Sequence, residues 1–171
     1  MQVRKATETD ADLFPDLEQS AGLSFRADPE LAWLADADNL PAERYREIVG
    51  EGWSWVAEDS PANPVAFVAA TLEDEELHIW EVGVRIECQR QGIGRLLLKR
   101  FVAEAAATRI AAITLTTFRD VPWNAPFYQS MGFEPVTAEN LDPRLAGLLA
   151  DEAHKGLPAA RRCAMRMKIL F

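Results

Sequence analysis

The chain has 171 residues, of which 49% are hydrophobic and 26% are charged. This length suits one domain with a sizeable core, so we expect residues 1–171 to form a single domain. The 27 acidic and 18 basic residues leave a formal net charge of −9. Nucleic-acid binders draw most of their affinity from a basic face, so the charge argues against that class.

The two cysteines, Cys88 and Cys163, lie far apart and have no partner at a metal-ligand spacing. We therefore expect no disulfide, no metal site and a reduced, cytoplasmic setting. The first residues contain no apolar signal core, and no run of apolar residues approaches the length of a membrane span. No membrane partner is expected.

Apolar spacing and capping residues predict the elements in chain order. Strands are expected at residues 2–6, 53–58, 65–72, 77–84, 111–118, 133–137 and 161–170. Helices are expected from Thr9 or Asp10 to Ser20 and at residues 29–36, 41–49, 92–108, 123–131 and 142–153. The strands between residues 53 and 84 form an antiparallel meander, and the strand-helix-strand run that follows implies a parallel pair with a right-handed crossover. The predicted fold class is α/β with a mixed sheet.

Residues 89–94, Gln-Arg-Gln-Gly-Ile-Gly, connect a predicted strand to the helix that follows it. Glycines at a helix start let backbone N–H groups approach a ligand, and the unpaired N–H groups of the first turn favour an anion. The glycine spacing fits neither the Gly-Lys-Ser/Thr phosphate loop nor the dinucleotide-binding loop. The alternative is a turn that needs glycines for packing alone.

The spacing Gln89-x-x-Gly92-x-Gly94 resembles the acyl-CoA pyrophosphate loop of the GNAT family of N-acetyltransferases. Further along, Tyr128 followed by Gly132 and Phe133 resembles the second motif of that family. The order of the predicted elements is similar to the family over nearly the whole chain. The resemblance implies the GNAT acyl-CoA N-acyltransferase fold, with a central, mostly antiparallel sheet, a splayed parallel pair and flanking helices.

The resemblance also implies acetyl-CoA as co-substrate and no metal. Backbone groups of Val82, Gly83 and Val84, next to a bulge in their strand, would bind the pantetheine arm. The pyrophosphate would lie on the glycine loop and the helix start, which comprise Gln89, Arg90, Gln91, Gly92, Ile93, Gly94 and Arg95.

In the second motif, the resemblance assigns Tyr128 to proton donation toward the departing CoA thiolate, a role that suits a phenol with a pKa of about 10. The alternative for Tyr128 is a core aromatic. Many family members carry an asparagine at the position of Val121. Asn124 is then either a helix cap or a cofactor contact, and Phe127 is assigned to the cofactor site.

An amine must lose a proton before it can attack a thioester, and two residues of the strand at 77–84 are candidates for the base. His78 and Glu81 lie on opposite faces of a regular strand, so they compete unless the strand bulges. His78 titrates near neutral pH without tuning, whereas Glu81 would act from a buried setting or through water. Each has a structural alternative, as a satisfied strand histidine or a carboxylate that binds the acceptor.

We therefore expect an N-acetyltransferase that moves the acetyl group of acetyl-CoA to the primary amine of a small molecule, by direct attack in a ternary complex. A non-catalytic acyl-CoA-binding sensor or scaffold and a protein or peptide N-acetyltransferase are the alternatives. The partners would be a small-molecule amine, no nucleic acid and no membrane, with a homodimer left open. By the same resemblance, the acceptor cleft would be walled by Phe25, Arg26, Trp33, Tyr45 and residues 116–123, with Glu18 or Asp120 for a cation.

Overall fold

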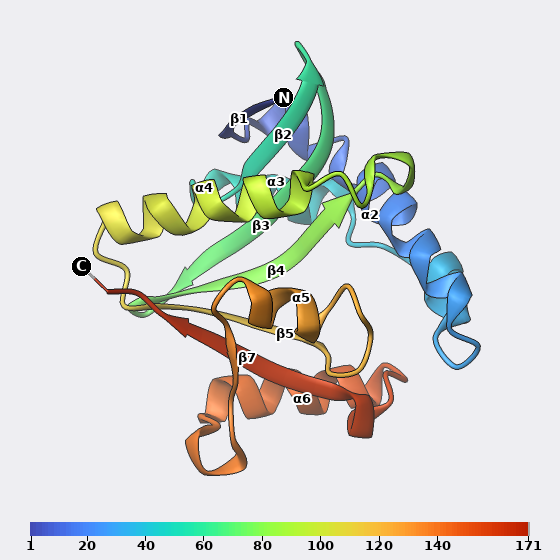
Figure 1. Cartoon of the computed structure of the whole chain (residues 1–171), viewed down its shortest axis with the longest axis vertical. Coiled ribbons are helices and arrows are strands. Elements are labelled where there is room, and N and C mark those ends of the chain that lie inside the picture. The colour runs from blue at the N-terminus through green and yellow to red at the C-terminus, as the bar shows by residue number, and fades with distance from the viewer. Residues whose placement is uncertain (171) are drawn as a thin grey trace. The chain divides into compact units, whose positions relative to one another are not determined.

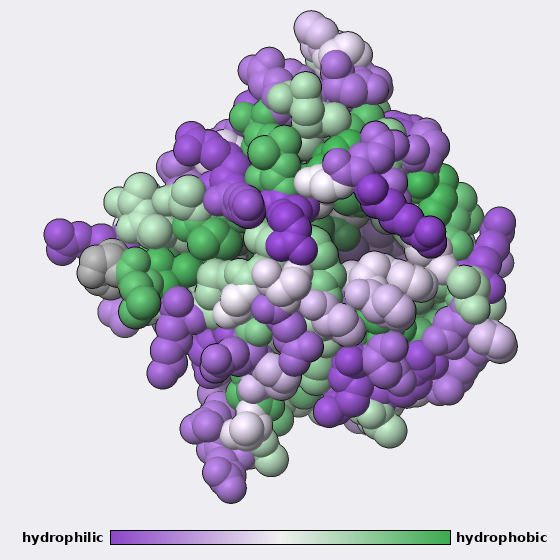
Figure 2. Space-filling model, viewed as in Figure 1, coloured by the Kyte–Doolittle hydropathy of each residue, from purple (hydrophilic) through white to green (hydrophobic). Residues whose placement is uncertain are grey.

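The structure is a computed structural model that describes residues 1–170. Its contacts divide the chain into two compact units. The first unit contains residues 1–72 and 79–108, and the second contains residues 73–78 and the chain from 109 onward. Hydrophilic side chains cover much of the face shown in Figure 2, as the charged composition predicts.

Within residues 1–170, seven strands are hydrogen-bonded in the order β1-β2-β3-β4-β5-β7-β6. The strands are β1 Gln2–Lys5, β2 Trp55–Ser60, β3 Asn63–Glu73, β4 Glu76–Val84, β5 Ala112–Phe118, β6 Glu134–Pro135 and β7 Arg162–Lys168. β4 and β5 are parallel, and the pairs β1-β2, β2-β3, β5-β7 and β6-β7 are antiparallel. This mixed α/β sheet with flanking helices confirms the predicted fold class.

The first unit holds four α-helices and a core built from aromatic residues. The helices are α1 Glu8–Ala11, α2 Phe14–Gly22, α3 Ala42–Gly50 and α4 Ile93–Ala107. α4 packs against β1 and β2 (Figure 1). The core joins Phe14 of α2, Tyr45 of α3 and Phe67 of β3, with the Phe14 and Phe67 rings stacked 4.2 Å apart.

The helix predicted from Thr9 or Asp10 to Ser20 is two helices, and its predicted cap is wrong. Thr7 caps α1, because the Asp10 carboxylate accepts hydrogen bonds from the Thr7 backbone N–H and hydroxyl. Burial raises the pKa of Asp10, but hydrogen bonds from Arg4 and Thr7 outweigh it and hold that pKa below its usual range. Pro15, at the start of α2, cannot donate a backbone hydrogen bond to the preceding turn, so the two helices stay separate.

The connection predicted at residues 59–64 is shorter than expected. β2 and β3 pair as far as Ser60 and Asn63, so only Pro61 and Ala62 form the turn. Ala62 adopts a φ of 61°, which fits the second turn position after a proline. The helix predicted at 29–36 is the short 3₁₀ helix Ala32–Asp36, which follows another at Leu23–Ala27.

The second unit contains the first residues of β4 and the strands β5, β7 and β6, with α5 Ala125–Ser130 and α6 Pro143–His154. β4 and β5 pair from Glu76 with Ala112 to His78 with Thr114. β5 pairs with β7 over its whole length, and α6 packs against both (Figure 1). β6 has two residues instead of the five predicted at 133–137.

Gly83→Ala should lower the free energy of unfolding by about 1–3 kcal/mol. A Cβ at Gly83 would lie 2.6 Å from Phe67 Cε1, and that ring is held by Phe14 and Tyr45. Urea unfolding followed by fluorescence measures the change. Gly50→Ala is the matched control, because a Cβ there meets no described residue within 4 Å beyond its chain neighbours and its own helix backbone. Equal midpoints for Gly83→Ala and wild type would contradict this account of Gly83.

Candidate functional site

The start of α4 carries the geometry of an anion site. Gly92 is the N-cap of α4 and has a φ of +79°, a conformation that favours glycine. Apart from its chain neighbours, no described residue comes within 4 Å of a Cβ built on Gly92, so the approach to this turn is open. The N–H groups of a first helical turn have no intrahelical acceptor. Arg90, two residues earlier, also has a positive φ, of 60°, and is exposed.

Two side-chain amides hold this loop in place. Gln89 Nε2 donates to the Val84 carbonyl at 2.9 Å, and Gln89 Oε1 accepts from Ser24 Oγ at 2.8 Å. The Ile86 N–H donates to Ser20 Oγ at 2.9 Å, and Gln91 Nε2 donates to the Glu87 carbonyl at 3.2 Å. The Gln89 side chain therefore braces the loop between β4 and the helical segment near Ser24. No local pattern could have revealed Ser20 or Ser24, because each lies about 65 residues from its partner in the chain.

Side chains in β4 do not alternate strictly. Trp80 packs against the core around Phe67, and its Nε1 donates to Thr71 Oγ1 at 2.7 Å. Gly83, three residues later, faces the same Phe67 ring. Residues three apart in a regular strand face opposite sides, so the alternation breaks between Trp80 and Gly83. A β-bulge would produce such a shift, and the bulge expected at residues 82–84 stays a prediction.

The end of α5 explains the spacing of the second motif. The Phe133 N–H donates to the Tyr128 carbonyl at 3.1 Å, and the Gly132 N–H donates to the Gln129 carbonyl at 3.0 Å. With Gly132 at a φ of +103°, this is a Schellman motif. The Tyr128 and Phe133 rings meet edge to face at 5.7 Å. Gly132 therefore ends the helix and Phe133 anchors it, as predicted, and both contacts position Tyr128.

Asn124 occupies the N-cap position of α5, but its side chain makes no capping hydrogen bond to the described residues. Its carbonyl accepts from the Tyr128 N–H at 3.0 Å, which starts the helix. The Phe127 ring contacts that of Tyr128 edge to face at 5.3 Å. Val121, where many family members have asparagine, is 1% exposed.

His78 lies in a polar network of the second unit and is 2% exposed. Its Nδ1 lies 2.9 Å from Thr114 Oγ1 and 3.2 Å from Arg144 Nη1. A guanidinium only donates, so Nδ1 is an acceptor and the neutral ring carries its proton on Nε2. Burial, followed by the charge of Arg144, lowers the pKa of His78 to about 4. No sequence pattern indicated Arg144. Its guanidinium also forms an ion pair with Glu76 at 3.2 Å.

A sequence model described as the acetyltransferase (GNAT) domain matches residues 50–135, half of the chain. The chain belongs to the GNAT acetyltransferase family. This confirms the resemblance that the glycine loop and the Tyr128 motif indicated, and it makes the protein an acyltransferase with acetyl-CoA as its co-substrate. The match runs through the residues of β2 to β6, which include both motifs.

Solved GNAT structures share the fold at low sequence identity. PaiA N-acetyltransferase of Thermoplasma acidophilum, in complex with coenzyme A, has a TM-score of 0.70 and 13% identity over 98% of each chain. The ribosomal-protein-S18-alanine N-acetyltransferase of Escherichia coli has a TM-score of 0.69 and 17% identity, over 99% of this chain and 94% of that one. An aminoglycoside 6'-acetyltransferase of type Ii has a TM-score of 0.64 and 17% identity, over 100% of this chain and 99% of that one.

The start of α4 fits the anionic end of acetyl-CoA, because Gly92 leaves its first turn open and Arg90 adds positive charge nearby. Among residues 1–170, no group of three or more His, Cys, Asp or Glu side chains is placed to hold a metal ion. Nor is any helix in this part of the chain long and apolar enough to cross a membrane.

The charge of Glu81, the second candidate base of this GNAT chain, influences Tyr45 in the core of the first unit. The Tyr45 side chain is fully buried, and burial, followed by the charges of Glu81 and Glu18, raises its pKa far above the usual value of a phenol. The Tyr45 hydroxyl donates to Glu18 Oε2 at 2.5 Å. Glu81 of β4 and Glu18 of α2 thus both raise the pKa of the Tyr45 hydroxyl.

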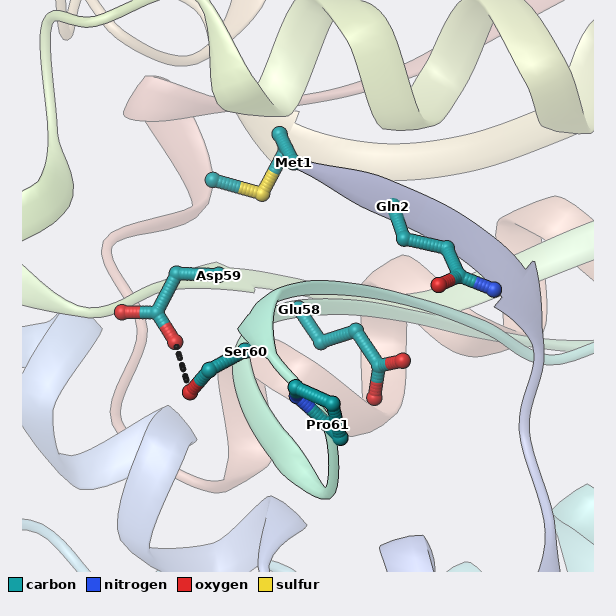
Figure 3. A pocket seen from close by; sticks show the side chains of 6 residues that line it. All are labelled: Met1, Gln2, Glu58, Asp59, Ser60 and Pro61. Carbon is teal, nitrogen blue, oxygen red and sulfur yellow. Dashed lines mark hydrogen bonds between the residues drawn. The ribbon is translucent and has the colours of Figure 1, made fainter.

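A separate pocket of about 240 Å³ lies beside the β2-β3 turn (Figure 3). It is lined by Met1, Gln2, Glu58, Asp59, Ser60 and Pro61. The Asp59 carboxylate accepts from Asn63 at 2.7 Å and from Ser60 at 3.0 Å, and Glu58 accepts from Arg4 at 3.0 Å. Its carboxylates are thus engaged in the hairpin and in β1, and it shares no residue with either GNAT motif.

Proposed function

We propose that this GNAT enzyme transfers the acetyl group of acetyl-CoA to the primary amine of a small molecule, by direct attack in a ternary complex. The observation that carries the proposal is the open, glycine-capped start of α4, where Gly92 exposes backbone N–H groups to an anion. We further propose that the two units act as one acetyltransferase domain. The family match supports this, because residues 50–135 include parts of both units.

Acetyl-CoA would be held by three groups of residues. The loop backbone from Gln89 to Gly94, with the Arg90 and Arg95 side chains, would bind the pyrophosphate. Backbone groups of Val82, Gly83 and Val84 would bind the pantetheine arm, and the Val84 carbonyl also accepts from Gln89 Nε2. Asn124 would contribute its side-chain amide, which is not used as a helix cap within the described chain. When bound, acetyl-CoA supplies the activated thioester that the amine attacks.

Glu81 is the base that the surroundings favour. His78 has a pKa of about 4, so it cannot efficiently take a proton from an ammonium group, and its Nδ1 already accepts from Arg144. Glu81 is half-buried in β4, one residue before the expected bulge at residues 82–84. Glu81 would accept a proton from the ammonium, directly or through water, and the neutral amine would attack the thioester carbonyl. No covalent enzyme intermediate is needed.

Tyr128→Phe should lower turnover about a hundredfold and leave the affinity for acetyl-CoA nearly unchanged. The variant removes the hydroxyl that we propose as proton donor to the CoA thiolate, and it retains the ring contacts with Phe127 and Phe133. Steady-state rates and a CoA titration measure the two quantities. A rate equal to that of wild type would remove Tyr128 from the chemistry.

A screen of amine acceptors tests the function itself. Purified protein is incubated with acetyl-CoA and each candidate amine, and the release of CoA thiol is followed with a chromogenic disulfide. The panel contains small primary amines, amino acids, aminoglycosides and peptides with free N-termini. Acceptor-dependent thiol release with a small amine supports the proposal, whereas release with peptides alone would replace it by protein acetylation. Tight CoA binding without release across the panel would favour a sensor.

A further inference from the structure

Glu18 is anchored through only one of its two carboxylate oxygens. Oε2 accepts from the Tyr45 hydroxyl at 2.5 Å and from the Leu40 N–H at 3.3 Å. No side chain or backbone group of residues 1–170 donates a hydrogen bond to Oε1. Glu18 itself is half-buried in α2. The carboxylate is therefore held through Oε2, and Oε1 makes no hydrogen bond to the described residues.

The hydroxyl that anchors Glu18 is fixed by the core. The Tyr45 ring lies edge to face against Phe14 at 5.3 Å and against Phe67 at 5.5 Å. The Phe67 ring in turn occupies the space beside Gly83 in β4. The Tyr45 ring that anchors Glu18 is thus fully buried and packs on Phe67, whose own ring lies beside β4, the strand of Glu81.

The carboxylates of Glu81 and Glu18 both influence the Tyr45 hydroxyl electrostatically. The ionisable side chains that influence Tyr45 are Glu81 from β4 and Glu18 from α2. Tyr45 stays protonated at any physiological pH, since burial and these charges raise its pKa. Burial also raises the pKa of Glu18, and it outweighs the hydrogen bonds from Tyr45 and Leu40. Glu18 therefore holds a proton more readily than an exposed glutamate does.

We propose that Glu18 is the proton relay of this acetyltransferase: Glu81 takes a proton from the acceptor ammonium, and Glu18 receives it at Oε1 and releases it to solvent. This inference rests on the proposed function. In the first step the ammonium becomes a neutral amine and Glu81 becomes a carboxylic acid. In the second step the proton passes to Glu18, directly or through water, and Glu81 is again ionised. Water then takes the proton from Glu18, so no oxidant, metal or further reactant is needed.

The test compares pH profiles of turnover for wild type and Glu18→Gln, at saturating acetyl-CoA and acceptor. In wild type both carboxylates must be ionised, so the logarithm of kcat should fall toward low pH with a limiting slope of two. Glu18→Gln should lower kcat at neutral pH about tenfold and reduce the limiting slope to one. A wild-type profile in Glu18→Gln would overturn the proposal. Asp16→Asn, an exposed carboxylate on the same helix, is the matched control and should behave as wild type.

Tyr45→Phe provides a second test if Glu18→Gln does not fold, as judged by CoA binding and thermal unfolding. The hydrogen bond from Tyr45 lowers the pKa of Glu18, so its loss should move the acid limb of the profile to higher pH. An acid limb that stays in place in Tyr45→Phe would contradict the relay. Failure of the proposed function gives a different result, because wild type itself would then release no thiol with any small amine.

Discussion

Gly92→Val should weaken the binding of CoA at least about a hundredfold, which corresponds to about 2.8 kcal/mol. The valine side chain would project into the open space at the start of α4, where a Cβ on Gly92 meets no described residue within 4 Å other than its chain neighbours. It would block the approach of phosphate oxygens to the N–H groups of the turn. A titration of the purified variant with CoA, followed by calorimetry, measures the dissociation constant.

Backbone strain must be separated from this effect, because a β-branched residue at a φ of +79° is strained wherever it occurs. Gly52→Val is the matched control. Gly52 has a φ of +85°, is equally open and follows α3, away from the loop. It should carry a similar loss of stability with normal CoA binding. CoA binding by Gly92→Val as tight as in wild type would refute the assignment of the loop.

Glu81→Gln should lower kcat about a hundredfold, whereas His78→Gln should preserve the acid limb of the pH profile. Glutamine keeps the size of Glu81 but cannot accept the proton of the ammonium. His78 has a pKa of about 4 and is neutral over the working range, so removing it takes no titrating group from the reaction. Rates from pH 5 to 9 with a confirmed acceptor distinguish the two residues. A lost acid limb in His78→Gln, with an intact rate in Glu81→Gln, would reverse their roles.

His78 should instead affect stability at low pH. Its pKa in the folded state is depressed below the usual value near 6.5, so between these two values the unfolded chain binds the proton more readily. Stability therefore declines as the pH falls from about 6.5 toward 4, and His78→Gln should remove that part of the decline.

Most strands and helices could be predicted from local patterns, because apolar alternation and helix caps can be recognised within a few consecutive residues. The cap of α6 is an example, since the Asp142 side chain accepts from the Leu145 N–H as the sequence indicates. The start of α1 was misplaced because its Thr7 cap involves Asp10, whose carboxylate Arg4 binds from another element. Tertiary contacts of this kind leave no periodic signal.

In the candidate site, too, local motifs were predicted and contacts between residues distant in the chain were not. The glycine loop was predicted from its glycines at a helix start and from the resemblance to the GNAT family, and the Tyr128 motif was predicted from that resemblance. The environment of His78 was not, since Arg144 reaches it from α6, 66 residues away in the chain. The Ser24 hydroxyl that binds Gln89 and the Tyr45 hydroxyl that binds Glu18 are equally remote in sequence. Choosing between His78 and Glu81 therefore required the fold.

The Phe133 N–H donates a hydrogen bond to the Tyr128 carbonyl. The direction in which the Tyr128 side chain points therefore depends on the number of residues between Tyr128 and Phe133. Residues 129–131 can be exchanged for others that tolerate a helix end. Their number cannot change, because one inserted residue would turn Tyr128 by about 100° around the axis of α5 relative to Gly132. Over evolutionary time, this segment should therefore accept substitutions freely and exclude insertions and deletions.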